Sequence, residues 1–401
     1  MKTQNILFIT KYVAGGLPGE FTYHGEWTDT FELILALKKR NPRLNIFLLT
    51  PKIKKTHRKR FWEEFGIVLK ENRIKHYLTD FYLDHNIPFS YFRFKMFLAE
   101  MKIIRKEKID VIQYGQFSYN FIYVFKRKFN IKIISYGCYD GKKDWEGKRM
   151  DEEYKKQLTD KWTWNELVLG IVLLGMIKLF RITLFDKKQD CIVTMHKSGF
   201  KLLSQNDYQR IFFIPKGAAN PYSFFKIRDK FRNIFFLANL QYRKGIKDFL
   251  DVATRFPDIS FYIFGVPFSR DIIKMIKRYV RDYPNIEFRG SLGYHEKWNI
   301  LSEMDLLLYP SYKDTYPSVI MEAMSCGMPV ITTLSIDSRV LDGYNGFLCS
   351  AGDLNCMIEK IELLQKNLVI YQKMSKNAFE TYKKNTWARA AEKFISLYNV
   401  I

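Results

Sequence analysis

The 401-residue sequence has few cysteines and arranges none of them in a metal-binding or redox pattern. There are five, an odd number, and no two have C-x-x-C spacing. Neither a disulfide framework nor a zinc site is therefore expected, and a reducing compartment such as the cytoplasm fits this usage.

Long apolar runs are also missing. The first run, Ile6 to Ile9, is too short for the core of a signal peptide and is typical of a strand. The most apolar region contains an uncharged run of eleven residues, Leu167 to Ile177, which is too short to span a bilayer. Two interpretations stay open for this run: a buried domain helix, or an interfacial helix anchored by its flanking tryptophans and basic residues.

Acidic residues are scarce relative to basic ones, which gives a net charge of +23. Such a charge requires an anionic partner, and the absence of helix-turn-helix, zinc-finger or RNP-like motifs argues against nucleic acid. Six cationic residues crowd the segment from Lys52 to Arg60, beside Phe61 and Trp62. The segment is either a solvated face or a contact with an anionic membrane surface.

The chain is long enough for two domains, and its apolar content of 47% excludes wholesale disorder. Short apolar and β-branched runs alternate with helical segments, which predicts α/β domains with parallel sheets. The expected strands are Asn5–Thr10, Asn45–Thr50, Asp110–Tyr114, Ile131–Tyr136, Asp190–Met195, Ile211–Pro215, Asn233–Asn239, Ser260–Gly265, Ile286–Gly290, Asp305–Tyr309 and Val330–Thr333.

The stretch from Leu306 to Val330 reads LLLYPSYKDTYPSVIMEAMSCGMPV and predicts strand, loop, helix and strand. We expect Ser318 to cap the helix, and Gly327 with the following Pro329 to end it. A helix that begins at the carboxyl edge of a parallel sheet directs its unpaired N–H groups at a site where phosphates bind.

Two acids flank this helix start, Asp314 in the loop and Glu322 in the helix, with seven residues between them. One acid in a first helical turn is explained by the helix dipole, whereas a pair is less easily explained in this way. Ionised carboxylates repel phosphate and only accept hydrogen bonds, so their natural partners are the hydroxyls of a sugar or a ribose.

This stretch resembles the Glu-x7-Glu region of the retaining GT-B glycosyltransferases of family 4, of the nucleotide-sugar-dependent group 1 type. The resemblance implies that Asp314 lies against the donor sugar and that Glu322 binds the ribose. It also implies that the backbone from Thr315 through Tyr316 and Pro317 to Ser318 faces the sugar and diphosphate. Pro317 stands where a glycine is common, which removes one N–H donor.

Two further loops resemble donor-binding segments of that family. Gly15 and Gly16 match a glycine pair that approaches the donor diphosphate, although glycines here are also explained by a tight turn. Lys244 matches a phosphate-binding lysine. Asn239 stands where the family has an arginine, and Arg243 is a candidate to replace that lost phosphate donor.

Tyr136 stands where the family has a histidine near the reacting sugar. A phenol with its ordinary pKa near 10 cannot act as a base at neutral pH, so Tyr136 is expected to orient the sugar or donate a hydrogen bond. His24 is an alternative, but a lone histidine in a loop is more often incidental.

The resemblance implies two Rossmann-like domains that face each other across a cleft. The expected domains are an acceptor-side domain at 1–215, a nucleotide-sugar-binding domain at 216–380, and a C-terminal helix at 381–401 that returns toward the first. The catalytic candidates are Asp314, Glu322, Lys244 and Tyr136.

The implied reaction is a retaining transfer from a UDP- or GDP-linked sugar, without a further cofactor. Because the sequence has no D-x-D motif, no metal is expected, and Lys244 with the helix dipole would stabilise the leaving diphosphate. We expect the acceptor to be a glycan or a polyprenyl- or lipid-linked molecule. We also expect the enzyme to be cytoplasmic and to bind peripherally to the inner face of the plasma membrane. Two alternatives are a catalytically silent scaffold subunit, which the departures at Tyr136 and Asn239 favour, and a sugar-nucleotide epimerase on the same fold.

Overall fold

The computed structural model describes most of the chain. The described residues are 4–10, 14–15, 22–23, 25–53, 55–82, 89–115, 129–137, 190–195, 197–204, 210–218, 220, 225, 229–314, 316–336 and 338–401. The apolar run from Leu167 to Ile177 lies outside them, as do His24, Gly16 and Thr315, so neither interpretation of that run is tested.

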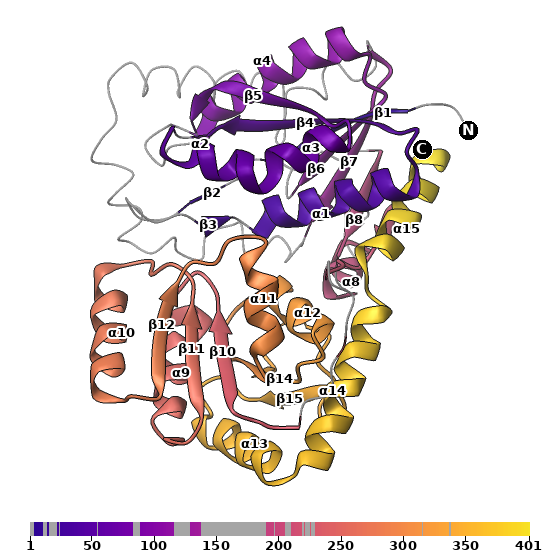
Figure 1. Cartoon of the computed structure of the whole chain (residues 1–401). Helices are drawn as coiled ribbons and strands as arrows, with labels where there is room; N and C mark the ends of the chain where they lie inside the picture. The colour runs from indigo at the N-terminus through magenta and orange to yellow at the C-terminus, as the bar shows by residue number, and fades with distance from the viewer. Residues whose placement is uncertain are drawn as a thin grey trace. The chain divides into compact units, whose positions relative to one another are not determined.

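The chain forms two compact units (Figure 1). The first unit comprises Met1–Val13, Glu26–Pro215 and Ala391–Ile401, and the second comprises Ala14–Gly25 and Lys216–Ala390. Each unit is built on a parallel sheet with helices around it, so the predicted α/β class is confirmed.

The sheet of the first unit has the order β5-β4-β1-β6-β7-β8-β9, and all its pairs are parallel. Its strands are β1 (Asn5–Ile9), β4 (Asn45–Lys52), β5 (Lys75–Tyr82), β6 (Val111–Gly115), β7 (Lys132–Gly137), β8 (Cys191–Thr194) and β9 (Ile211–Phe213). The helical elements assigned to this part of the chain are α1 (Gly25–Arg40), α2 (Lys55–Phe61), η1 (Trp62–Gly66), α3 (Ile67–Glu71), α4 (Phe89–Glu107), α8 (Lys197–Ser204) and α15 (Trp387–Val400).

The sheet of the second unit has the order β12-β11-β10-β13-β14-β15, again with parallel pairs. Its strands are β10 (Asn233–Leu237), β11 (Ser260–Phe264), β12 (Ile286–Gly290), β13 (Leu306–Tyr309), β14 (Val330–Thr333) and β15 (Gly346–Cys349). A separate antiparallel pair joins β2 (Ala14–Gly15) and β3 (Thr22–Tyr23).

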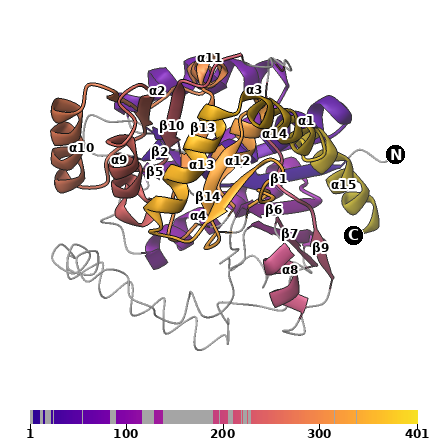
Figure 2. The same cartoon turned by 90° about the horizontal axis from the view of Figure 1, so that it is seen from below.

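The helical elements of the second unit are η3 (Tyr242–Lys244), α9 (Ile246–Ala253), α10 (Arg270–Asp282), α11 (Glu296–Glu303), α12 (Ser318–Ser325), α13 (Leu354–Lys366) and α14 (Leu368–Lys383). Helix α14 packs against α12 and α13, as both views show (Figures 1 and 2). Strand β13 lies in the middle of the sheet and is buried throughout, because helices cover both faces of a parallel sheet.

Every strand expected from the sequence is present, with ends that differ by at most two residues. Among the strands of the two parallel sheets, the sequence did not predict β5 or β15. Strand β5 mixes polar and apolar residues and forms an edge, and β15 has four residues, so neither shows a long buried run.

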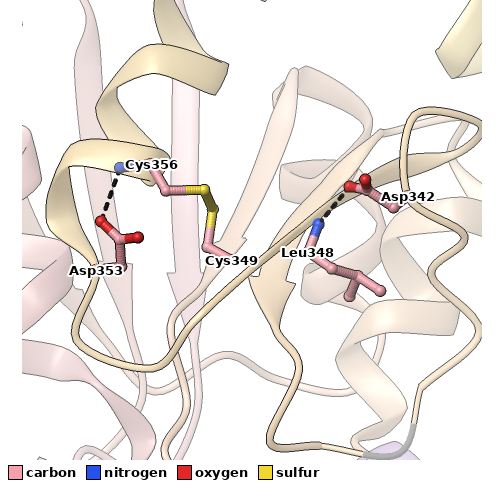
Figure 3. The surroundings of a disulfide bond; sticks show 5 residues. All are labelled: Asp342, Leu348, Cys349, Asp353 and Cys356. Carbon is pink, nitrogen blue, oxygen red and sulfur yellow. Dashed lines mark hydrogen bonds between the residues drawn. A yellow bond between two sulfur atoms is a disulfide. The ribbon is translucent and has the colours of Figure 1, made fainter.

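The structure contradicts the expectation of no disulfide. Cys349, at the end of β15, is bonded to Cys356 in the first turn of α13 (Figure 3). The Cα atoms lie 6.0 Å apart, within the range that a disulfide spans. Sequence spacing missed the pair because the turn between strand and helix brings together two cysteines seven positions apart. The number and spacing of the cysteines therefore no longer indicate a reducing compartment.

An aromatic cluster connects α1, the α2–η1 stretch and β5 in the first unit. The rings of Phe61 and Phe65 pack on Trp27, and the ring of His76 lies beside Trp27 and Phe61. Phe61 is fully buried, so of the two aromatics beside the basic segment it is not available to contact a membrane surface. Trp62 is 42% exposed.

The π-helical turn of η1 aligns Phe61, Phe65 and Leu69, which lie four residues apart, on one side of the helical stretch. In a regular α-helix, two side chains four residues apart point in directions that differ by about 40° around the helix axis. The wider π turn shifts the following side chains in the opposite sense. Phe61, Phe65 and Leu69 therefore share the buried side, while Trp62 and Ile67 are exposed.

Among the helices that the structure describes, none combines the length and the apolar character needed to cross a membrane.

The buried His76 predicts acid sensitivity of the first unit. Burial lowers its pKa from 6.5 to about 4, and its Nδ1 has no hydrogen-bond partner among the described residues. Below pH 6.5 the unfolded chain gains a proton that the folded chain does not bind. The free energy of unfolding should therefore fall as the pH drops toward 4, by about 3 kcal/mol from this residue.

Denaturant unfolding followed by tryptophan fluorescence measures this loss, because Trp27 reports on the cluster. His76→Gln should flatten the pH dependence, whereas His295→Gln, at an exposed histidine of the second unit, should leave it as in the wild type. An equal acid loss in wild type and His76→Gln would exclude His76 as its cause.

Candidate functional site

The loop between β13 and α12 carries the two acids that the sequence singled out. Helix α12 begins at Ser318, and Pro317 is its N-cap residue with no side-chain cap. The expectation that Ser318 caps the helix is wrong, because its hydroxyl accepts a hydrogen bond from Lys216 Nζ at 2.5 Å. Pro317 precedes the first turn, so its missing N–H is not one of the helix's own first N–H groups.

Asp314 is held by two partners at one oxygen. Its Oδ2 contacts Lys244 Nζ and accepts a hydrogen bond from the Tyr309 hydroxyl at 2.5 Å. Burial lowers the pKa of Lys244, and the charge of Asp314 opposes that shift. Burial, followed by the charge of Asp314, raises the pKa of Tyr309 well above its ordinary value. The Asp314 carboxylate is thus fixed in position as a charged acceptor.

Glu322, on the first turns of α12, is also paired. Its Oε1 lies 2.8 Å from Lys297 Nζ of α11, and both side chains are largely buried. The ammonium of Lys297 also lies over the ring of Trp298, 4.8 Å from its centroid. Each of the two acids therefore has its own lysine.

The loop before α9 is fastened to the acid-bearing loop. The carbonyl of Arg243 accepts hydrogen bonds from Tyr312 N at 3.0 Å and from Ser311 Oγ at 3.3 Å. Gly245 has a φ of +82°, and a Cβ there would lie 2.1 Å from the carbonyl oxygen of Pro310. Only glycine permits both the left-handed backbone and this approach.

Tyr316 holds the end of the acid-bearing loop in an uncommon conformation. It has a φ of +54°, and its side chain is buried. Arg339 Nε lies 2.6 Å from the Tyr316 hydroxyl, and its guanidinium lies over the same ring. A non-glycine residue in this region costs free energy and is found where neighbouring contacts impose it.

The remaining predicted residues lie elsewhere or are solvent-exposed. Tyr136 is buried in β7 of the first unit, where its ring meets Phe394 of α15 edge-on at 5.1 Å. Gly15 is in β2 and pairs with Thr22 of β3. Asn239 is exposed in the loop after β10.

Three residues of the site were missed by the sequence analysis: Lys216, Lys297 and Arg339. Each is one of the 65 lysines and arginines of the chain, and no motif distinguishes it. Their roles come from contacts between segments at least 23 residues apart, which local sequence does not show.

The charged groups that act on Lys244 are mostly cationic. Arg243 and Lys216 each lower the pKa of Lys244 through their charge, so all three act within one electrostatic environment. Among the charged groups Lys216, Arg243, Lys244 and Asp314, three are positive and one is negative. This arrangement suits a bound anion that also presents hydroxyls to the carboxylates.

Comparison with known proteins gives a family for the second unit. The family model of glycosyl transferases group 1 matches residues 223–381. The chain is also 24% identical, over 183 residues, to the N,N'-diacetylbacillosaminyl-diphospho-undecaprenol alpha-1,3-N-acetylgalactosaminyltransferase of Campylobacter jejuni. That match covers 43% of this chain and 45% of the relative, and the chain spans less than half the length of the first curated relatives it matches.

Two solved structures match nearly the whole chain. Sucrose-phosphate synthase of Thermosynechococcus elongatus has a TM-score of 0.71 at 15% identity, over 99% of this chain and 98% of the other. Anabaena HepE in complex with UDP-glucose has a TM-score of 0.64 at 14% identity, over 99% and 100%. At these identities the likeness shows the fold, which is GT-B.

The close approach at Gly245 gives a prediction with a built-in control. Gly245→Ala should destabilise the second unit by the backbone cost of a left-handed alanine, about 1 to 2 kcal/mol, plus a steric cost from Pro310. Gly290→Ala is the matched control, because Gly290 has a φ of +72° and nothing within 4 Å of a new Cβ. Denaturant unfolding should show a larger loss in the free energy of unfolding for Gly245→Ala than for Gly290→Ala. Equal losses would show that the contact with Pro310 adds no steric cost.

Proposed function

We propose that the chain, whose residues 223–381 match the family model of glycosyl transferases group 1, transfers a sugar from a nucleoside diphosphate donor to an acceptor with retention of configuration. The observation that carries the proposal is the pair of lysine-bound carboxylates, Asp314 with Lys244 and Glu322 with Lys297, beside the start of α12.

In the proposed complex, Asp314 accepts a hydrogen bond from a hydroxyl of the donor sugar and Glu322 accepts from the ribose. Lys244 and the N-terminal end of α12 stabilise the negative charge that develops on the leaving diphosphate. These cations supply charge compensation without a metal ion, so the proposed reaction is metal-independent.

Retention is proposed to follow attack on the face that the diphosphate leaves. Asp314 supports this route over a covalent one, because Lys244 and Tyr309 already engage its Oδ2 and lower its tendency to act as a nucleophile. The acceptor hydroxyl would instead give its proton to a phosphate oxygen.

The donor and the acceptor are proposed by class. HepE was solved with UDP-glucose, which supports a UDP- or GDP-linked donor. The Campylobacter relative is named for a diphospho-undecaprenol acceptor, which supports a lipid-linked glycan acceptor at the cytoplasmic face of a membrane.

A transfer assay tests this function directly. The purified chain is incubated with UDP- and GDP-sugars and a polyprenyl-diphosphate glycan, and the anomeric configuration of the product is read by NMR. Binding of sugar nucleotide without transfer or donor hydrolysis would favour the scaffold alternative, which the exposed Asn239 in place of an arginine supports. Conversion of one sugar nucleotide into another would favour the epimerase.

The ribose role gives a prediction for Glu322→Gln. The amide keeps the size but loses the charged acceptor, so UDP or GDP should bind about 10-fold more weakly by calorimetry, with the fold retained. Glu362→Gln is the matched control, because Glu362 pairs with Lys366 at 2.8 Å on an exposed helix face. Unchanged affinity in Glu322→Gln would remove the ribose role.

Peripheral membrane contact is proposed for the continuous helical stretch Lys55–Glu71. Its exposed side carries Lys55 and Lys59 together with Trp62 and Ile67, which are 42% and 58% exposed. Cations beside exposed apolar side chains suit an anionic lipid surface.

Sedimentation with vesicles tests this contact. Binding to phosphatidylglycerol vesicles should fall steeply with added salt, and Trp62→Ser should weaken it several-fold. Tyr283→Ser, at an exposed aromatic of the second unit, is the control. Equal binding to anionic and neutral vesicles at low salt would exclude the membrane contact and leave the transferase proposal untouched.

A further inference from the structure

Lys297 is a largely buried lysine in the first turn of α11. Its side chain is 12% exposed, and its Nζ lies 2.8 Å from Oε1 of Glu322 on α12. The partial positive charge at the start of a helix disfavours a cation there, and burial of an ammonium group adds a further cost. The carboxylate of Glu322 offsets both costs, so the lysine and the acid depend on each other.

Two aromatic rings flank the ammonium of Lys297. Its Nζ lies 4.8 Å from the ring centroid of Trp298 and 5.6 Å from that of Tyr294. Both distances are within the roughly 6 Å at which a cation is attracted to a ring. Trp298 is 2% exposed and belongs to the core of the second unit. Lys297 therefore has less conformational freedom than a solvated lysine, whose long side chain samples many rotamers.

The backbone that carries Lys297 is fixed by hydrogen bonds. The backbone N–H of Lys297 donates to the carbonyl of Gly293 at 3.0 Å. The N–H of Gly293 donates in turn to Oε2 of Glu296 at 3.1 Å, which closes the turn before α11. The ammonium of Lys297 thus extends from a fixed turn, lies between two rings and gives Glu322 a fixed partner.

Glu322 needs such a partner for the role proposed above. A glutamate has three rotatable side-chain bonds, and a hydrogen bond to its carboxylate requires a defined distance and angle. The ion pair engages Oε1, and a carboxylate has about four acceptor positions in all. A carboxylate held by a lysine at one oxygen can therefore accept hydrogen bonds from a pair of neighbouring hydroxyls at a fixed position.

We propose that Lys297 is a positioning residue which, by holding Glu322, makes the site selective for a ribonucleotide over a deoxyribonucleotide. The inference rests on the proposed transferase function and deepens it, because it names the residue that sets the selectivity for the sugar of the nucleotide. Lys297 does not touch the ligand in this proposal. Its effect reaches the ribose only through the carboxylate of Glu322.

The test compares nucleotides that differ only in the ribose hydroxyls. Calorimetry measures UDP and GDP, each beside its 2′,3′-dideoxy form, with the wild type and the Lys297 variants. The wild type should bind the ribonucleotide about 10-fold or more tightly than the dideoxy form, because a charged acceptor loses its hydroxyl partners in the latter.

Lys297→Met should reduce that preference several-fold, through weaker binding of the ribonucleotide at nearly constant affinity for the dideoxy form. Lys297→Arg should recover most of the preference, because it keeps a cation beside Glu322. Lys366→Met is the matched control, since Lys366 pairs with Glu362 at the same 2.8 Å on an exposed helix face, and it should show no change. In steady-state assays of Lys297→Met, the donor KM should rise while kcat changes little, because the ribose is remote from the reacting bond.

A purely structural role for Lys297 predicts a different result. A general loss of folding would weaken the ribonucleotide and the dideoxy form alike and leave their ratio unchanged, and that outcome would overturn the inference. If Lys297→Met does not fold, the ratio in Lys297→Gln decides in the same way.

A double variant tests whether Lys297 acts through Glu322. In the Glu322→Gln background, Lys297→Met should cause no further loss of the ribose preference, because the carboxylate that it positions is gone. A further loss of the same size as in the wild-type background would show that Lys297 acts independently of Glu322, and would contradict the proposal.

The outcomes also separate this inference from the proposed function. A preference that falls in Glu322→Gln and persists in Lys297→Met would remove Lys297 alone. A wild type that transfers sugar but binds both nucleotide forms equally would remove the ribose role and this inference, and would leave the transferase. A wild type that binds neither UDP nor GDP would overturn both proposals.

Discussion

The candidate site depends on the fastening of two loops that are about 70 residues apart in sequence. The carbonyl of Arg243 accepts hydrogen bonds from the loop after β13, and Gly245 lies against Pro310 with no room for a side chain. This fastening sets the register at which Lys244 meets Asp314. A largely buried ion pair is favourable only with good geometry, because both ions have lost water. The backbone hydrogen bonds and the close packing at Gly245 therefore set the geometry on which the Lys244–Asp314 ion pair depends.

The pairing of each acid with its own lysine explains how carboxylates can stand beside an anion site. Asp314 and Glu322 would repel phosphate if they were alone, and Lys244 and Lys297 cancel that repulsion. A carboxylate has about four acceptor positions, so a carboxylate that binds a lysine can also accept hydrogen bonds from hydroxyls. The site can therefore receive a ligand that is anionic at one part and hydroxyl-rich at another, which is the chemistry of a sugar nucleotide.

The sequence predicted the sheets and the acid pair because both have local signals. Strands show as short apolar runs, and Asp314 and Glu322 stand at a fixed spacing on either side of a helix start. It failed for the cap at Ser318, the burial of Phe61 and the disulfide of Cys349 and Cys356. Each of these depends on a contact with another segment. Lys216 binds the hydroxyl of Ser318, residues of α1 and β5 pack on Phe61, and the β15–α13 turn brings the two cysteines together.

The cationic residues behind the net charge of +23 differ in how far they are exposed to water. Exposed lysines such as Lys59 are solvated and screened by salt, so their attraction to a lipid surface is weak for each residue and sums over many. Lys244 is largely withdrawn from water, and the carboxylate of Asp314 compensates its charge at short range. Composition counts both kinds alike, and burial distinguishes them. Burial therefore separates Lys244, which is held against Asp314, from the exposed cations, which define only a surface of favourable potential.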